Sequence, residues 1–219
     1  MIKRKLAVII LFSFAAFAAE INAAPETKIY NQQVREAYQQ YASTLTEKRN
    51  DLVFENGDKA NDCNTYLKAS KASAIGEGVN NQIIKGEYLV CDVLSLLGKR
   101  QFIIPKIMPK IGERLATQVD LRSFPSSVFP QLNDRKFTLS KLTGKLTVGA
   151  TAVSLDSVDW HYTIEVVATA DINNNGKTDW IFWLVDEARM GNYRGYQTLV
   201  AYDVGAKDTW IKPGVFPKQ

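Results

Sequence analysis

The chain has 219 residues, and 46% of them are hydrophobic, which is enough for one domain with a packed core. Its single histidine excludes H-E-x-x-H metalloprotease sites and histidine-rich zinc sites. The formal net charge at pH 7 is only +4, too little to indicate a nucleic-acid partner.

Residues 1–23 have the pattern of a secretory signal peptide. Three basic residues, 3–5, precede an apolar run over 6–19, and the small residue Ala23, or earlier Ala18, offers a cleavage point. The apolar run is too short to span a bilayer comfortably, and no later stretch is apolar for long enough. We therefore expect a periplasmic or secreted protein with no transmembrane segment after cleavage.

Removal of the signal peptide leaves one expected domain, residues 24–219. The remaining charges are 24 Lys and Arg against 22 Asp and Glu, a net charge of +2. The pI of 8.9 is therefore no reason to expect nucleic-acid binding. The domain divides into a helical part at about 30–98, a connector at about 99–135 and a β part at about 136–212.

Two helices are predicted in the first part. Apolar residues recur at helical spacing over 31–50, which indicates an amphipathic helix whose tyrosines pack in the core or form a binding face. The segment 60–78 reads as a loop with a short ordered piece near Tyr66. A second helix is expected over 80–97, ending at Gly98, although Gly86 weakens it and a strand over 87–93 is the alternative.

Cys63 and Cys91 are the two cysteines of the chain. An even pair in an exported protein favours a disulfide over two buried thiols. In the chain-entropy model a bridge closing this 28-residue separation stabilises the fold by about 3 to 4 kcal/mol.

The segment 99–135 is rich in proline, which suits an extended connector. It is also locally basic. Five charges over sixteen residues indicate either a solvated face or a contact with an anionic partner. The basic residues are Lys99, Arg100, Lys106, Lys110 and Arg114.

Strand patterns begin near residue 136. A hairpin is expected from 145–148 and 151–155, followed by an alternating strand over 160–168 and an apolar strand over 180–185. A last strand is expected over 196–202. Helices first and an antiparallel meander after predict an α+β fold, with the N-terminal helices packed on one face of the sheet.

Between two of these strands lies the sequence DINNNGKTD, residues 171–179. Short oxygen-bearing side chains stand at its positions 1, 3, 5 and 9, and a glycine stands at position 6. Calcium needs this arrangement, because its ligands are oxygens and the loop must turn sharply to gather them. A plain Asn-Gly hairpin turn is the alternative, but such a turn requires neither flanking aspartate.

The loop resembles the calcium loops of FG-GAP repeats, with the pattern D-x-[DN]-x-[DN]-G-x-x-D. The resemblance implies side-chain ligands from Asp171, Asn173, Asn175 and Asp179, and a backbone carbonyl ligand from Lys177. An EF-hand is not expected, because Phe182 stands where its bidentate glutamate belongs. The pattern occurs once, so a propeller is not expected either. The chain as a whole resembles small exported bacterial proteins of unknown function that carry one such loop.

Catalytic patterns are weak. No G-x-S-x-G elbow surrounds Ser126 or Ser127, which with His161 are the candidates for a nucleophilic site. Asp186 and Glu187 suggest a carboxylate pair, but neighbours on one strand point to opposite faces.

We expect the polar, glycine-containing segment 186–194 to be a partner-binding loop. Its candidate binding residues are Asp186, Glu187, Tyr193 and Arg194. The function that follows is an exported calcium-binding module with an unknown protein or glycan partner. A calcium-dependent secreted hydrolase that uses carboxylates is the alternative.

Overall fold

A mostly antiparallel sheet runs through the middle of the molecule. The computed structural model describes residues 25–106, 109–206 and 210–217, and these form an eight-stranded sheet, a two-stranded sheet and helices. The main strands are β1 (Thr27–Ile29), β4 (Phe102–Ile103), β5 (Lys145–Val148), β6 (Ala152–Asp156), β7 (Trp160–Ala170), β8 (Asp179–Ala188), β9 (Arg194–Ala201) and β10 (Gly214–Phe216). The order β10-β9-β8-β7-β1-β4 is antiparallel except for the parallel pair β1 and β4. The α+β class is therefore confirmed.

The predicted helices are present in shorter pieces. The first segment forms α1 (Gln32–Gln39) and α2 (Tyr41–Thr46), and the second forms α4 (Val79–Lys85) and α5 (Leu89–Leu97), joined by a 3-10 turn at Gly86–Tyr88. Because residues 87–93 are helical, the strand alternative is wrong. Gly98 ends α5 with φ 56°, the left-handed conformation that glycine adopts without strain.

Two elements fill the predicted loop at 60–78 and the turn before it. A short hairpin pairs β2 (Leu52–Val53) with β3 (Lys59–Ala60), and helix α3 spans Cys63–Ala69. Asp62 caps α3, since its carboxylate accepts the Thr65 N–H at 2.8 Å. The capping box explains why an otherwise polar stretch forms a helix here.

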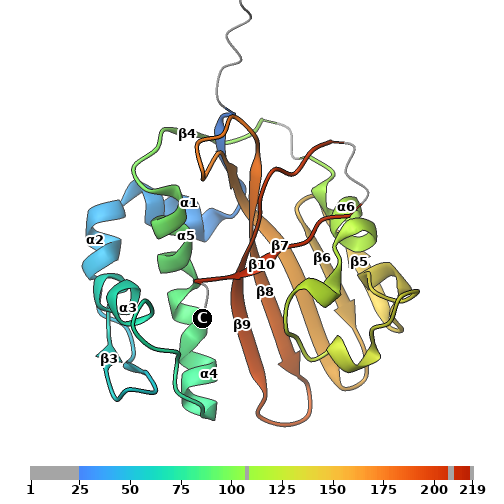
Figure 1. Ribbon diagram of the computed structural model, residues 1–219, viewed down its shortest axis with the longest axis horizontal. Helices are drawn as coiled ribbons and strands as arrows, with labels where there is room; N and C mark the ends of the chain where they lie inside the picture. Colours follow the sequence, from blue (N-terminus) through green and yellow to red (C-terminus); the bar gives the residue numbers. More distant parts are fainter. Residues whose placement is uncertain (1–24, 107–108, 207–209, 218–219) are drawn as a thin grey trace, which may run out of the picture.

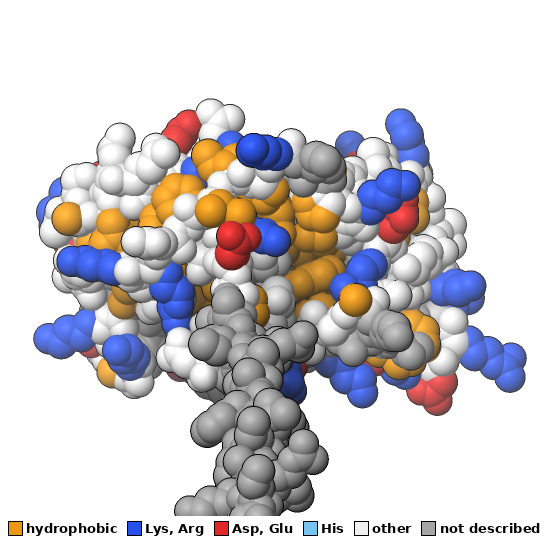
Figure 2. All heavy atoms as spheres, turned by 90° about the horizontal axis from the view of Figure 1, so that it is seen from above, with side chains coloured by type: hydrophobic (Ala, Val, Ile, Leu, Met, Phe, Trp, Pro, Cys, Tyr) orange, Lys and Arg blue, Asp and Glu red, His pale blue; other side chains and the backbone are white. Residues whose placement is uncertain are grey.

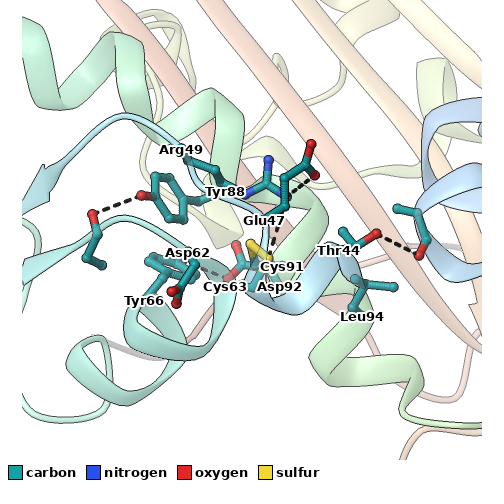
Figure 3. The surroundings of a disulfide bond; sticks show 12 residues. Thr44, Glu47, Arg49, Asp62, Cys63, Tyr66, Tyr88, Cys91, Asp92 and Leu94 are labelled. Carbon is teal, nitrogen blue, oxygen red and sulfur yellow. Dashed lines mark hydrogen bonds and ion pairs between the residues drawn. A yellow bond between two sulfur atoms is a disulfide. The ribbon is translucent and has the colours of Figure 1, made fainter. Parts of the chain in front are cut away.

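The Cys63–Cys91 disulfide is confirmed. It joins the first residue of α3 to α5, with a Cα–Cα distance of 5.1 Å. Figure 3 shows the bridge between the two helices, with Tyr66, Tyr88 and Asp92 close by. The bridge therefore fastens the α3 segment to the most deeply buried helix of the N-terminal part.

Helices cover both faces of the sheet. One core cluster joins α1 and α5 to the sheet through Val167, Ile181 and Val200, and a second joins α6 (Ile111–Gln118) to it through Ile164 and Phe182. Figure 1 shows α1 to α5 to the left of the central strands and α6 to their right. The expectation that helices lie on one face is thus not confirmed for α6.

Helix α6 lies inside the segment predicted as an extended connector. Prolines 105 and 109 precede it and 125 and 130 follow, but the stretch between them lacks proline and carries Ile111, Leu115 and Ala116 on one buried side. Among the described residues, no helix is long and apolar enough to cross a membrane. The predicted signal peptide falls within residues 1–24, outside the described part of the chain.

The predicted basic segment does not act as one surface. The Arg100 guanidinium donates to the Leu97 carbonyl at 2.6 Å, and the Arg114 guanidinium lies 4.8 Å from the centre of the Trp180 ring. Lys99, Lys106 and Lys110 are exposed. Figure 2 shows basic and hydrophobic side chains interspersed on the upper end of the molecule.

Candidate functional site

The calcium-like loop connects β7 to β8. Asp171 directly follows the last residue of β7, and Asp179 is the first residue of β8. Their exposed fractions are 7% and 0%. Burial of two carboxylates at a turn is costly unless they are hydrogen-bonded or bind a cation.

Backbone N–H groups of the loop bond to these carboxylates. Asp171 accepts from the Asn175 N–H at 2.9 Å and from the Gly176 N–H at 2.8 Å. Asp179 accepts from the Ile172 N–H at 2.8 Å. Gly176 has φ 80°, and a Cβ there would meet nothing within 4 Å, so the backbone conformation rather than lack of space requires glycine.

The two asparagines of the motif also accept hydrogen bonds. The Asn173 side-chain oxygen lies 3.3 Å from the Asn175 nitrogen, and the Asn175 side-chain oxygen accepts the Lys177 N–H at 3.0 Å. All four predicted side-chain ligands therefore accept hydrogen bonds from backbone N–H groups of this loop. A carboxylate or amide oxygen has two lone pairs, so one bond leaves capacity for a cation.

Asp203 is a further carboxylate at this site that the sequence did not indicate. It follows β9 with φ 57°, and its N–H donates to Asp179 at 2.8 Å. Its carboxylate accepts from the Asn175 amide at 2.6 Å and from the Lys177 ammonium at 2.9 Å. These two hydrogen bonds, that of Asn175 foremost, lower the pKa of Asp203. No local pattern marks Asp203; only the pairing of β8 with β9 brings it here.

The donor set fits a hard cation such as calcium. Its atoms are carboxylate, amide and carbonyl oxygens, which calcium prefers. In the described part of the chain no three His, Cys, Asp or Glu side chains gather as a metal site. A site here would therefore need the asparagine and backbone oxygens, and Lys177 would supply its carbonyl while its ammonium offsets one negative charge.

Arg100 connects this loop to the helical part of the molecule. The Arg100 guanidinium donates to the Ile172 carbonyl at 3.2 Å as well as to the end of α5. The position of the loop is therefore coupled to the helix that carries the disulfide.

The predicted partner-binding segment is partly strand. Strand β8 continues through Asp186 and Glu187 to Ala188, and β9 begins at Arg194. Only residues 189–193 form the turn. A ten-residue strand is about 30 Å long, so this turn and the calcium-like loop lie at opposite ends of β8.

Asp186 and Glu187 point to opposite faces of the sheet and form no carboxylate pair. Asp186 is 1% exposed and accepts hydrogen bonds from the N–H and hydroxyl of Ser127. Burial raises the pKa of Asp186. Glu187, on the other face, accepts from the Tyr196 hydroxyl and lies 3.8 Å from the Arg194 guanidinium.

The histidine is not near either candidate serine. His161 bonds through Nδ1 to Asp156 at 2.8 Å and through Nε2 to the Thr163 hydroxyl at 3.0 Å. Ser127 is engaged by Asp186 instead. These bonds form a ladder of polar side chains across β6 and β7, not a Ser-His-Asp site at Ser126 or Ser127.

Tyr193 and Arg194 line a cleft of about 840 Å³. Its walls come from α3, α4 and the segment before it on one side, and from β9, β10 and Pro125 on the other. Figure 1 shows α4 beside β9, with α3 farther from the sheet. The aromatic lining residues are Tyr66, Tyr193, Tyr196 and Phe216, and the polar ones include Gln82, Lys85, Arg194 and Gln197. Its volume is that of an ordinary ligand site.

A buried ionic cluster forms part of this wall. The Lys85 ammonium lies 3.2 Å from the Asp92 carboxylate and also donates to the Tyr66 hydroxyl, which donates in turn to Asp92 at 2.8 Å. Asp92 is 0% exposed, and burial raises its pKa against the opposing effect of Lys85. The sequence did not predict this cluster, because its three residues lie on three different helices and form no local motif.

The four tryptophans of the chain lie in separate places. Trp160 packs edge-on against Tyr193 with ring centroids 5.4 Å apart, whereas Trp210 packs against Phe137 at 4.7 Å. Trp180 and Trp183 lie on opposite faces of the sheet. Only Tyr193 of these residues lines the cleft.

Comparison of the chain with protein-family models, with curated proteins and with solved structures found no match.

Proposed function

We propose that this protein is an exported binding module whose ligand occupies the cleft between α3–α4 and β9–β10. The observation that carries the proposal is the cleft itself. It has the volume of a ligand site, an aromatic and apolar lining and a few polar groups from different elements. Two of the residues expected from the sequence to bind a partner, Tyr193 and Arg194, are part of its wall.

Calcium has a structural part in this proposal. An ion bound by Asp171, Asn173, Asn175, Asp179 and the Lys177 carbonyl would hold the end of β7 to the start of β8. The ion would supply positive charge between two carboxylates that otherwise repel each other. The site lies at the far end of β8 from the turn beside the cleft, so no contact of the ion with the ligand is proposed.

Export is proposed from residues 1–23 alone. N-terminal sequencing of protein recovered from the periplasm or the medium is expected to begin at Ala24, or at Ala19 under the earlier cleavage. Recovery of chains that begin with Met1 in the cytosolic fraction only would refute export.

A carboxylate hydrolase is less well supported. Asp186 and Glu187 diverge, and Glu77 is the single carboxylate among the residues that line the cleft. General acid and base catalysis needs ionisable groups that converge on one substrate. The described part of the cleft has tyrosines and amides instead.

The proposal can be tested with labelled protein on a glycan array and a peptide array. Replacement of Tyr193 and Arg194 by alanine is expected to reduce binding at least tenfold in a variant that a thermal melt shows to be folded at the assay temperature. Arg189→Ala is the matched control, because Arg189 is an exposed arginine of the same turn that does not line the cleft.

Binding that survives the double replacement would place the site elsewhere. Turnover of glycosidic, ester or peptide substrates that is lost in Asp186→Asn or Glu187→Gln would favour the hydrolase instead.

A further inference from the structure

The cleft lies at an edge of the main sheet. Strand β10 is the terminal strand on this side, and residues of both sheet faces line the cleft. Tyr196 and Phe216 lie on the face toward α4 and α5, and Gln197 and Val215 lie on the opposite face. A cleft lined from both faces must contain the open edge between them.

The pairing register shows which backbone groups this edge presents. The Tyr193 carbonyl accepts from the Ala188 N–H, so residues 193, 195, 197 and 199 direct their backbone polar groups toward β8. Residues 198 and 200 then direct theirs toward β10, where they pair with Phe216 and Gly214. Val215, which alternates with these two, directs its N–H and C=O away from the sheet.

In the described part of the chain, a second backbone pair on this side has no strand partner. Pairing of β9 with β10 stops at Thr198 and Phe216, and Pro217, which has no N–H, follows. Tyr196 lies beyond this point, and its N–H and C=O also point away from β8. In the described part of the chain, neither Val215 nor Tyr196 has a strand partner on this side.

An open edge with directed N–H and C=O groups is the structure that binds an extended peptide. We propose that the cleft binds an extended segment of another polypeptide chain, which adds to the edge of β10 through backbone hydrogen bonds. This inference rests on the proposed function, since it names the ligand class of the same cleft.

The side chains around the edge fit that ligand. Alternate side chains of an added strand point to opposite faces, and the cleft offers tyrosine and apolar contacts on the α4 side and Val215 with Pro125 on the other. Val79 of α4 is 44% exposed, and α4 has no buried residue, so apolar surface is available on that wall.

The cations of the cleft are already paired. The Lys85 ammonium lies 3.2 Å from the Asp92 carboxylate, and the Arg194 guanidinium lies 3.8 Å from the Glu187 carboxylate. The carboxylate of Glu77 also lines the cleft. Charge therefore does not select the segment, and backbone hydrogen bonds to the sheet edge carry its recognition.

The test selects phage-displayed random heptapeptides on the immobilised protein. Enriched peptides, made synthetically, are measured by fluorescence anisotropy against wild type, Val215→Ala and Val215→Pro. Both variants remove the valine side chain, but only proline removes the outward N–H. Proline is tolerated on an edge strand where the N–H faces away from the sheet. We expect proline to reduce affinity at least tenfold more than alanine does.

Changes in the peptide provide a test that leaves the protein intact. N-methylation at alternate positions is expected to reduce affinity at least tenfold in one register and little in the other. Because these results do not depend on the folding of Val215→Pro, the proposal stays testable if that variant unfolds.

Two results would overturn the inference: no enrichment over the Val215→Pro protein, or equal loss in both N-methyl registers. If glycans bind instead, and Tyr193→Ala with Arg194→Ala abolishes that binding, the cleft remains the ligand site and only peptide addition is rejected.

Discussion

At the scale of single residues, the ion pair of Lys85 and Asp92 permits a quantitative prediction. Lys85→Met leaves the fully buried Asp92 carboxylate without its cation, and removal of one partner of a buried pair costs about 3 to 5 kcal/mol of unfolding free energy. Lys85→Met combined with Asp92→Asn removes both charges, and the amide can still accept from Tyr66. We expect urea unfolding to show most of the lost stability restored in the double variant.

The stability of the single variant Lys85→Met should depend on pH. Burial raises the pKa of Asp92 in the folded protein, and loss of Lys85 removes an effect that lowers it. The folded chain then takes up a proton more readily than the unfolded chain, so the penalty shrinks as pH falls toward the carboxyl pKa of the unfolded state and grows as pH rises.

Lys48→Met is the control, because the Lys48 side chain is 70% exposed and Asp62 keeps its hydrogen bonds to Thr65 without it. It should cost less than about 1 kcal/mol. A similar loss in both lysine variants would show that the buried pair has no special role.

Single residues were predictable where the interaction is local. The loop residues from Asp171 to Asp179 follow a spacing that one turn can satisfy, and two cysteines allow one pairing. Asp203 and Asp92 could not be found this way, because their partners come from other elements. Phase along a strand did predict that Asp186 and Glu187 diverge, since alternation is a property of the strand alone.

At the scale of elements, helix α6 depends on a close approach to the β5–β6 hairpin. The Gly112 N–H donates to the Ala150 carbonyl at 3.0 Å. A Cβ on Gly112 would lie 2.7 Å from the Ala152 carbonyl oxygen and closer still to that of Gly149. Gly112→Ala therefore must push α6 away from the hairpin, and overpacking of this kind costs about 1 to 3 kcal/mol.

Glu113→Ala is the matched control, because Glu113 is the next residue of α6 and its side chain is 65% exposed. Urea unfolding should show a loss for Gly112→Ala and a change within about 0.5 kcal/mol for Glu113→Ala. Equal stability of Gly112→Ala and wild type would mean that α6 does not pack on the hairpin in this way.

Element prediction succeeded for long strands and failed for short ones. β7 and β8 are long enough for alternation or an apolar run to be recognised, whereas β1, β4 and β10 have two or three residues and no readable period. Helix α6 was hidden because prolines on both sides dominate the composition of its surroundings. Short strands that form only by pairing with distant strands are therefore missed when prediction uses local sequence patterns.

At the scale of the whole molecule, a bulge in β7 determines how the layers fit together. The register shifts between Val166 and Ala168, so Val167 and Ala168 both join the core under α1 and α5 while Ile164 and Val166 face α6. A strict period of two across this strand would put Ala168 and Ala170 on the face toward α6 instead. The two-layer expectation from sequence could not include this shift, because nothing in the residue types marks it.

Calcium should stabilise the whole domain, because the loop holds β7 to β8 at the centre of the sheet. With two formal charges in the motif, we expect affinity in the micromolar to sub-millimolar range. If free calcium is about a hundred times the dissociation constant, binding adds roughly 2.7 kcal/mol to the free energy of unfolding. For a domain of this size that raises the melting temperature by roughly 5 to 10 °C.

The measurement is a thermal melt of the protein in calcium and in chelator, with calorimetry of calcium binding. Asp171→Asn keeps an acceptor for the Asn175 N–H but removes one charge, so its calcium-dependent shift should be smaller than that of wild type. Asp58→Asn, in the exposed β2–β3 turn, should keep the full shift. Because Asp179 accepts from two backbone N–H groups, Asp179→Ala should melt low in both buffers. Identical wild-type melts, together with no heat of binding, would reduce the loop to a hydrogen-bonded turn.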